Sequence, residues 1–159
     1  MDTSMHTSIA RNATFAPRMD FRALGPDAMR AMGALDLRVH HSDLEKSLVE
    51  LVRIRVSQLN GCAFCIDKHT ADARRGGEDE RRLTLLPVWR DTPFFSERER
   101  AALAWAEALT RIADAPVDDA LWSWVEDVFV PSQLIDLTLA INAVNGWNRF
   151  GIAFRKLPS

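Results

Sequence analysis

The sequence predicts an all-α fold, and three features carry this prediction. Apolar residues recur at three- and four-residue intervals over residues 44–59, which is the period of an amphipathic helix. Helix start signals precede several further segments, and no segment shows the sustained two-residue alternation of a half-buried strand. A length of 159 residues and a hydrophobic content of 47% suit one globular domain with its own core.

The N-terminal segment differs from the rest of the chain. Residues 1–20 are polar, lack a hydrophobic period and include Pro17, so we expect a loose N-terminal arm. Residues 21–159 are expected to form the single helical domain. Its first clear helix should follow Gly25-Pro26, because proline suits the first helical position.

The next helix is predicted over residues 44–59. Ser42 or Asp43 provides its start signal, and charged residues occupy the faces that the apolar residues leave. Asn60-Gly61 should end this helix, since glycine is frequent just after the last periodic residue.

Three further helices are predicted downstream. Ser96 and Glu99 form a Ser-x-x-Glu capping box that opens an alanine-rich run. Asp118 or Asp119 can cap a short helix, and Ser132 can cap a long one that continues to about residue 150.

Charge and hydropathy exclude several classes of partner. The formal net charge of −2 and the isoelectric point of about 6.1 give no overall attraction to nucleic acid or to an anionic membrane. No apolar run approaches the roughly 18 residues that span a bilayer, and the N-terminus lacks the apolar core of a secretory signal. We therefore expect a cytoplasmic protein with no nucleic-acid or membrane partner.

The most informative motif contains both cysteines of the chain. Cys62 and Cys65 form a Cys-x-x-Cys, and His69 follows one helical turn later, on a helix expected to begin at Cys62 and end near Gly76-Gly77. In a reducing compartment such a pair is more often a metal site or a catalytic dithiol than a structural staple. Glu50 lies on the preceding helix, and a helical hairpin could place its carboxylate near His69.

The residue types do not decide which cysteine is the nucleophile. Cys62 lies at a helix start, where free N–H groups and the helix dipole favour a thiolate by about 0.3 to 1 kcal/mol. His69 would instead lower the pKa of Cys65, which is four residues away on the same helix. Both alternatives stay open on this reasoning.

A zinc site is the main alternative use of the motif. Cys62, Cys65 and His69 would supply three ligands, and a closed structural site needs a fourth. The chain has no other cysteine, and its remaining histidines are expected in the arm or in an inter-helix turn: His6, His40 and His41. Glu50 taken alone would be a surface carboxylate paired with Arg53 or Lys46.

A stripe of asparagines marks the C-terminal segment. Asn142, Asn145 and Asn148 recur every three residues, although asparagine is a poor helix former. We interpret them as a polar seam in helix packing or at a subunit interface. A substrate-pocket role, with Arg149 binding an anionic group, is the alternative. The five tryptophans are expected to be core or interface anchors.

The motif resembles that of a known family. The pattern is Glu50, eleven residues, Cys62-x-x-Cys65, three residues and His69, and it matches the AhpD-like alkylhydroperoxidases of the carboxymuconolactone decarboxylase superfamily in order and spacing. The similarity covers most of residues 45–155, including RVSQLNGCAFCIDKHTADARRGG and INAVNGWNRF. It implies an AhpD-like helical bundle with the Cys-x-x-Cys at the start of a helix, assembled as a homo-oligomer, either a trimer or a hexamer.

The resemblance also implies a reaction. Carried over, Cys65 attacks an organic hydroperoxide, Cys62 resolves the sulfenic acid to a disulfide, and Glu50 and His69 form the proton relay. An external dithiol or reductase then reduces the disulfide, and no metal, flavin or other cofactor is required. AhpD itself has a histidine immediately before its second cysteine, whereas this chain has Phe64, which would make the pocket more apolar.

Two other functions are compatible with the sequence. A decarboxylase or lactone-processing enzyme of the wider superfamily would use Glu50 or His69 as acid or base and leave the thiols unused. A non-catalytic redox-sensing module would oxidise reversibly with negligible turnover.

Overall fold

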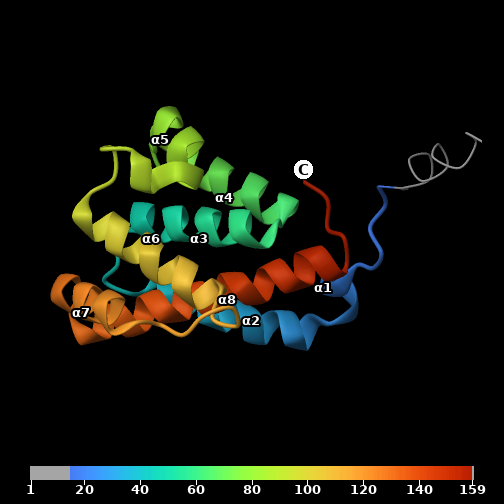
Figure 1. The fold of residues 1–159 in the computed structure, drawn as a ribbon. Helices are drawn as coiled ribbons and strands as arrows, with labels where there is room; N and C mark the ends of the chain where they lie inside the picture. Colours follow the sequence, from blue (N-terminus) through green and yellow to red (C-terminus); the bar gives the residue numbers. More distant parts are fainter. Residues whose placement is uncertain (1–14, 159) are drawn as a thin grey trace, which may run out of the picture.

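The computed structural model describes residues 15–158, and these residues form helices and no strand, as the sequence predicts (Figure 1). The elements in chain order are α1 (Phe21–Leu24), α2 (Pro26–His40), α3 (Lys46–Asn60), α4 (Ala63–Arg75), α5 (Glu80–Leu85), the 3-10 helix η1 (Leu86–Asp91), α6 (Glu97–Thr110), α7 (Asp119–Val128) and α8 (Pro131–Ala153).

Helix α3 lies at the centre of the fold and packs against α4, α6 and α8 (Figure 1). Its apolar residues divide between two clusters. Val52 and Val56 join a cluster with α6, α7 and α8, whereas Leu51 and Ile54 join a second cluster with α4, α5 and η1. Because α3 packs against neighbours on both sides, its backbone is fixed, and so are the positions from which its side chains project.

A tight turn connects α3 to α4 and confirms the predicted helix break. Gly61 has a φ of +70°, in the left-handed region that side chains disfavour, and its N–H donates to the carbonyls of Ser57 and Gln58. Cys62 follows in an extended conformation as the N-cap of α4. The chain therefore reverses, and the beginning of α3 lies beside the middle of α4.

The asparagine seam holds this turn against α8. The side-chain amide of Asn60 donates to the side-chain oxygens of Asn145, at 2.9 Å, and Asn148, at 2.8 Å. Asn148, which is fully buried, donates to Ser57 Oγ at 3.0 Å. The predicted use in helix packing is confirmed for Asn145 and Asn148, and the bonds fix the end of α3 just before Cys62.

Two predicted helix starts are wrong. Helix α3 begins at Lys46, because the Ser42 hydroxyl donates to Val39 O and completes the end of α2 instead of capping α3. Helix α8 begins at Pro131, which fixes its own backbone for the first helical position, so Ser132 falls inside the first turn.

The other start signals are confirmed. Ser96 and Glu99 form the predicted capping box, and the Asp118 side chain accepts from Leu121 N at the start of α7. The helix after Gly25 begins at Pro26 as predicted, and α4 ends at Arg75, directly before Gly76.

The segment between α4 and α6 was not predicted. It forms α5 and η1, and η1 carries Trp89, whose side chain is 2% exposed. The Trp89 indole N–H donates to Glu107 Oε1 at 2.9 Å, Arg90 pairs with the same carboxylate, and Arg55 Nε of α3 donates to it at 2.7 Å. Glu107 of α6 thus joins η1 and α3 through a single carboxylate.

The described part of the N-terminal segment contacts the C-terminal end of α8. Residues 1–14, which contain most of the predicted arm, lie outside them, and Arg18 N–H donates to Phe154 O at 2.9 Å. Among the described residues no single helix is long and apolar enough to cross a membrane. Helices α7 and α8 reach that length and composition only together, and they meet at a bend of 117°.

We expect Glu107→Gln to lower the free energy of unfolding by about 2 to 4 kcal/mol at pH 7, because the shielded donors of Trp89 and Arg55 and the exposed guanidinium of Arg90 lose an ionised partner. Burial acts to raise the pKa of Glu107, but hydrogen bonds from Arg90, Trp89 and Arg55 outweigh it and hold the pKa below its ordinary value. The ionised carboxylate therefore stabilises the fold fully above the ordinary glutamate pKa of about 4.3 and progressively less as the pH falls through the folded pKa.

Urea unfolding at pH 7, 5, 4 and 3 tests this expectation, and the difference between wild type and variant should shrink toward the acid end. Glu126→Gln on the exposed face of α7 is the matched control and should change stability by less than about 0.5 kcal/mol. A gap that is constant with pH would contradict the ionic role of Glu107.

Candidate active site

The two cysteines are joined as a disulfide at the start of α4. Their Cα atoms lie 5.3 Å apart, and the two residues are 1% and 3% exposed. Cys62 N–H donates to Ser57 O at 3.0 Å, so the pair is fastened directly to the end of α3. The alternative of a zinc site would require both sulfurs as thiolates. In the disulfide neither sulfur is a thiolate.

Helix α8 passes directly over the disulfide at Gly151. A Cβ atom at this position would lie 2.9 Å from Cys62 Sγ and 3.5 Å from Cys65 Sγ. The first distance is shorter than two packed atoms tolerate, so only glycine lets α8 approach the sulfurs this closely.

His69 and Glu50 meet across the α3–α4 hairpin, as the sequence predicts. His69 Nδ1 lies 2.9 Å from Glu50 Oε2. Burial acts to raise the pKa of Glu50, but the hydrogen bond and charge of His69 and the charge of Arg53 outweigh it, so the pKa lies below its ordinary value. An ionised carboxylate only accepts hydrogen bonds, so Nδ1 is the nitrogen that donates to Glu50, whether or not the ring carries a second proton.

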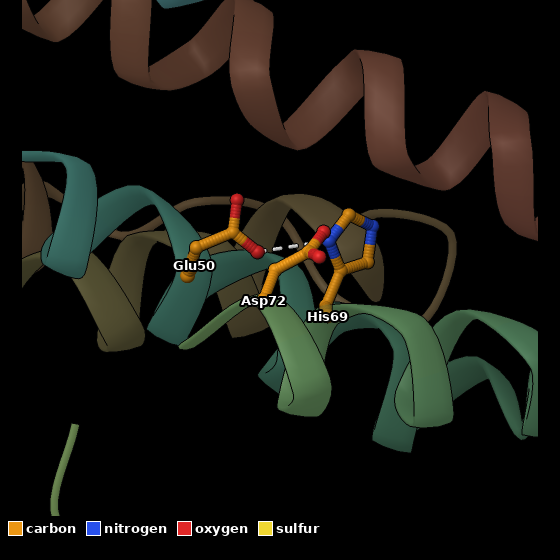
Figure 2. Close-up of side chains that lie close together, drawn as sticks. All are labelled: Glu50, His69 and Asp72. Atoms are coloured by element: carbon orange, nitrogen blue, oxygen red, sulfur yellow. Dashed lines mark hydrogen bonds and ion pairs between the residues drawn. The ribbon is translucent and has the colours of Figure 1, made fainter. Parts of the chain in front are cut away.

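This arrangement leaves the other ring nitrogen of His69 free to act as a base. Figure 2 shows that nitrogen on the side of the ring away from Glu50. Cys65 precedes His69 by one helical turn, so the two side chains are neighbours on α4. A carboxylate that holds one imidazole nitrogen and leaves the other toward a nucleophile is a recurrent device in hydrolytic and thiol enzymes.

A chain of hydrogen bonds holds Glu50 in turn. Arg53 Nη1 donates to Glu50 Oε1 at 2.7 Å, and Arg53 Nη2 donates to Asp36 Oδ1 at 3.0 Å. The Trp147 indole N–H donates to Asp36 Oδ2 at 2.6 Å. Side chains of α2, α3, α4 and α8 are thus connected from Trp147 to His69, and both oxygens of each carboxylate have a partner.

Asp72 adds a second carboxylate beside His69. Figure 2 shows Glu50 projecting from α3 and Asp72 and His69 from α4. One carboxylate oxygen of each acid and one ring nitrogen of His69 lie within 4.8 Å of one another. Three such groups can ligate a cation, but Arg53 already pairs with Glu50, and Lys68 and Arg75 pair with Asp72. We interpret the cluster as an imidazole flanked by two carboxylates that arginine and lysine neutralise.

A cavity of about 470 Å³ opens beside Cys65 and His69, and we call it the Cys65 cavity. Its apolar lining comes from α1, α2, α4 and α8: Phe21, Met29, Leu37, Phe64 and Trp147. Its charged or ionisable lining, besides His69, consists of Arg22, Asp36, His40, Arg53 and Lys68. Cys65 and Gly151 lie at its inner surface.

The structure brings the four residues of the sequence motif together and revises the interpretation of their surroundings. His40, expected in a turn, is the last residue of α2 and lines the Cys65 cavity. Arg149 donates to Asn145 O at 3.0 Å, and the tryptophan that lines the cavity is Trp147. Trp89 and Trp105 are buried as expected, whereas Trp122 is 44% exposed.

Sequence reasoning missed several residues of the site, including Asp36, Asp72 and Gly151, and did not place Trp147 on a cavity. Asp36 and Trp147 come from helices far from the motif in the sequence, and nothing near them indicates that they meet. Gly151 follows directly after the predicted end of the last helix, where glycine is typical of a helix stop, whereas α8 continues through it to Ala153.

Comparisons with known proteins agree on a family. The model of the carboxymuconolactone decarboxylase family matches residues 26–108. The uncharacterized protein YdfG of Bacillus subtilis is 41% identical over 136 residues, which cover 86% of this chain and 92% of YdfG.

Solved structures share the fold. A protein of unknown function from Agrobacterium tumefaciens, ATU0492, provisionally named an AhpD antioxidant defence protein, gives a TM-score of 0.88 at 35% identity, over 91% of this chain and 99% of its own. The debrominase Bmp8 gives a TM-score of 0.77 at 21% identity, over 86% of this chain and 74% of its own. The likeness to Bmp8 shows the fold alone.

We expect Gly151→Ala to destabilise the oxidised protein by about 1 to 3 kcal/mol, because the new Cβ would overlap the sulfur of Cys62. Gly33→Ala is the matched control, since a Cβ there meets nothing within 4 Å. In the interior of α2 that change should be neutral or stabilise the fold by up to about 1 kcal/mol. Urea unfolding of the oxidised wild type and of both oxidised variants measures the change in the free energy of unfolding. A Gly151→Ala variant as stable as the wild type would contradict the close approach of α8.

Proposed function

Because the chain belongs to the carboxymuconolactone decarboxylase family, we propose that it is a thiol-dependent peroxidase of the AhpD type that reduces organic hydroperoxides. One observation carries the proposal: Cys65 lines a cavity together with His69, and Glu50 holds the far nitrogen of that imidazole. Cys62 lies within disulfide reach of Cys65.

In the first step the Cys65 thiolate attacks one oxygen of the hydroperoxide. The S–O bond forms as the O–O bond breaks, so the sulfur is oxidised to sulfenic acid and the peroxide is reduced to an alcohol. The proton that His69 takes from the Cys65 thiol goes to the departing alkoxide, which makes His69 base and then acid.

In the second step Cys62 attacks the sulfur of the Cys65 sulfenic acid. The disulfide forms, and the hydroxyl leaves as water with the proton of the Cys62 thiol. An external dithiol then supplies two electrons and two protons to restore both thiols. The disulfide in the structure corresponds to the end of the oxidative half of this cycle.

Two features support Cys65 as the attacking residue, which the residue types alone left open and the family resemblance implies. Cys65 lines the cavity, and the free nitrogen of His69 is one helical turn away on the same helix. Cys62, at the N-cap of α4, is covered by Gly151 of α8 and suits the resolving role. We propose further that the protein acts as a homo-oligomer, a trimer or a hexamer.

Thiol titration and intact mass of the fully reduced protein test the proposal. One equivalent of cumene hydroperoxide, with a chelator present, should consume both thiols and leave a disulfide that a dithiol reverses. Cys65→Ser should abolish the reaction, and Cys62→Ser should stop at a sulfenic acid that dimedone traps. Thiols that stay reduced would overturn the proposal, and one stoichiometric oxidation without turnover in excess dithiol would favour a redox sensor.

We expect Glu50→Gln to slow the oxidation of Cys65 by about tenfold or more, because the amide no longer fixes the tautomer of His69 or supports its charge. The measurement is the second-order rate constant of thiol loss with cumene hydroperoxide at pH 7. Glu80→Gln, on the exposed start of α5 where Glu80 pairs with Arg74, is the matched control and should react at the wild-type rate. An unchanged rate for Glu50→Gln would remove Glu50 from the relay.

A further inference from the structure

The charges that line the Cys65 cavity are predominantly positive, although the whole chain is acidic. Arg22 of α1, Arg53 of α3 and Lys68 of α4 reach the cavity, against a single carboxylate from Asp36 of α2. The other ionisable groups on its lining are His40 and His69, besides the thiol of Cys65 itself. The formal charge of the chain is −2, so this excess is local to the cavity.

Most of these charges are already neutralised by the protein. Arg53 is shared between Glu50 and Asp36, and Asp36 accepts a further hydrogen bond from Trp147. Lys68 Nζ lies 2.6 Å from Asp72 Oδ2. A ligand that bound either cation would have to displace an existing ion pair.

Arg22 is different because no carboxylate of the described residues pairs with its side chain. Its guanidinium lies 5.5 Å from the centre of the Trp147 ring, which is a cation–π contact. The nearby acid Asp20 uses Oδ1 to accept from the backbone N–H groups of Arg22 and Ala23, as the N-cap of α1. The exposed guanidinium thus keeps its N–H edges available.

The cation–π contact gives the guanidinium a preferred position beside the Trp147 ring. The Trp147 indole N–H donates to Asp36 Oδ2 at 2.6 Å, so the ring that Arg22 contacts is held in place. An arginine presents its N–H fork in the plane of the guanidinium, where it can bind a carboxylate through two parallel hydrogen bonds. The ordering cost of that contact is partly met before a ligand arrives.

We propose that Arg22 selects substrates that carry an anionic group, so that the hydroperoxide reduced at Cys65 is that of an apolar organic acid. The carboxylate would bind Arg22 at the rim, and the apolar part would lie against Phe21, Phe64 and Trp147 on the way to the sulfur. The identification of the substrate as a hydroperoxide rests on the proposed function. The binding of an anionic group by Arg22 does not depend on it, because it is a property of the cavity.

The test compares cumene hydroperoxide with its para-carboxylated derivative, which differs by one anionic group. The rate constant for oxidation of the reduced wild-type protein should be about tenfold higher for the carboxylated compound, as expected for one paired charge. In Arg22→Gln the ratio of the two rates should fall to about one, and Arg22→Lys should keep part of the preference. Arg30→Gln, on the exposed face of α2 where Arg30 pairs with Asp27, should leave both rates unchanged.

Equal rates in the wild type, or a preference that survives in Arg22→Gln, would overturn the inference. If neither compound oxidises the thiols, the proposed function fails, and the inference is decided by calorimetric titration with the two corresponding alcohols. The carboxylated alcohol should then bind the wild type about tenfold more tightly than the parent, and Arg22→Gln should remove the difference.

An anionic dithiol reductant would offer the same chemistry to Arg22. Reduction of the disulfide by 2,3-dimercaptopropanesulfonate is therefore compared with reduction by uncharged 2,3-dimercaptopropanol. A dependence on Arg22 that is seen only in this pair would assign the anion to the reductant and overturn the assignment to the hydroperoxide. A dependence seen with the hydroperoxides supports it.

Discussion

The contact between Glu50 and His69 is the constraint on which the rest of the site depends. It joins the beginning of α3 to the middle of α4, so it exists only if the turn at Gly61 reverses the chain in one register. The left-handed backbone of Gly61 and the bonds from Asn60 to α8 set that register. A shift of one residue along either helix would rotate the two side chains apart by about 100°.

The same contact explains the charged groups buried around it. A carboxylate in this position would lose much of its hydration, and Arg53 compensates by pairing with it at 2.7 Å. Arg53 needs a second acceptor, which Asp36 supplies, and Asp36 in turn accepts from Trp147. Each group therefore supplies the hydrogen-bond partner that the previous one needs. The series of hydrogen bonds ends at Trp147, an aromatic ring that lines the cavity.

Much of the fold was predictable from the sequence because its signals are local. The capping box at Ser96, the aspartate cap at Asp118 and the glycine at position 61 each act on residues within one turn. The 3-10 helix η1 escaped prediction because its Trp89 is held by the buried carboxylate of Glu107, a partner that is distant in the sequence. Helix α5 does carry a local signal, the Asp79 cap at its start, which the sequence-based prediction did not use. The site divides in the same way: the spacing of Glu50, Cys65 and His69 was legible, whereas Asp36 and Trp147 were not.

The position of the disulfide determines from which side the sulfur of Cys65 is accessible. Cys62 and Cys65 are nearly excluded from solvent, and α8 closes over them at Gly151, so the space into which Cys65 can react lies on the cavity side. Burial alone would raise the pKa of a thiol and make it inert. In the proposed function His69, on the same helix, offsets that effect as a base without opening the site to water. The structure thus combines a protected sulfur with a held imidazole, and both are fixed by helices that the core already immobilises.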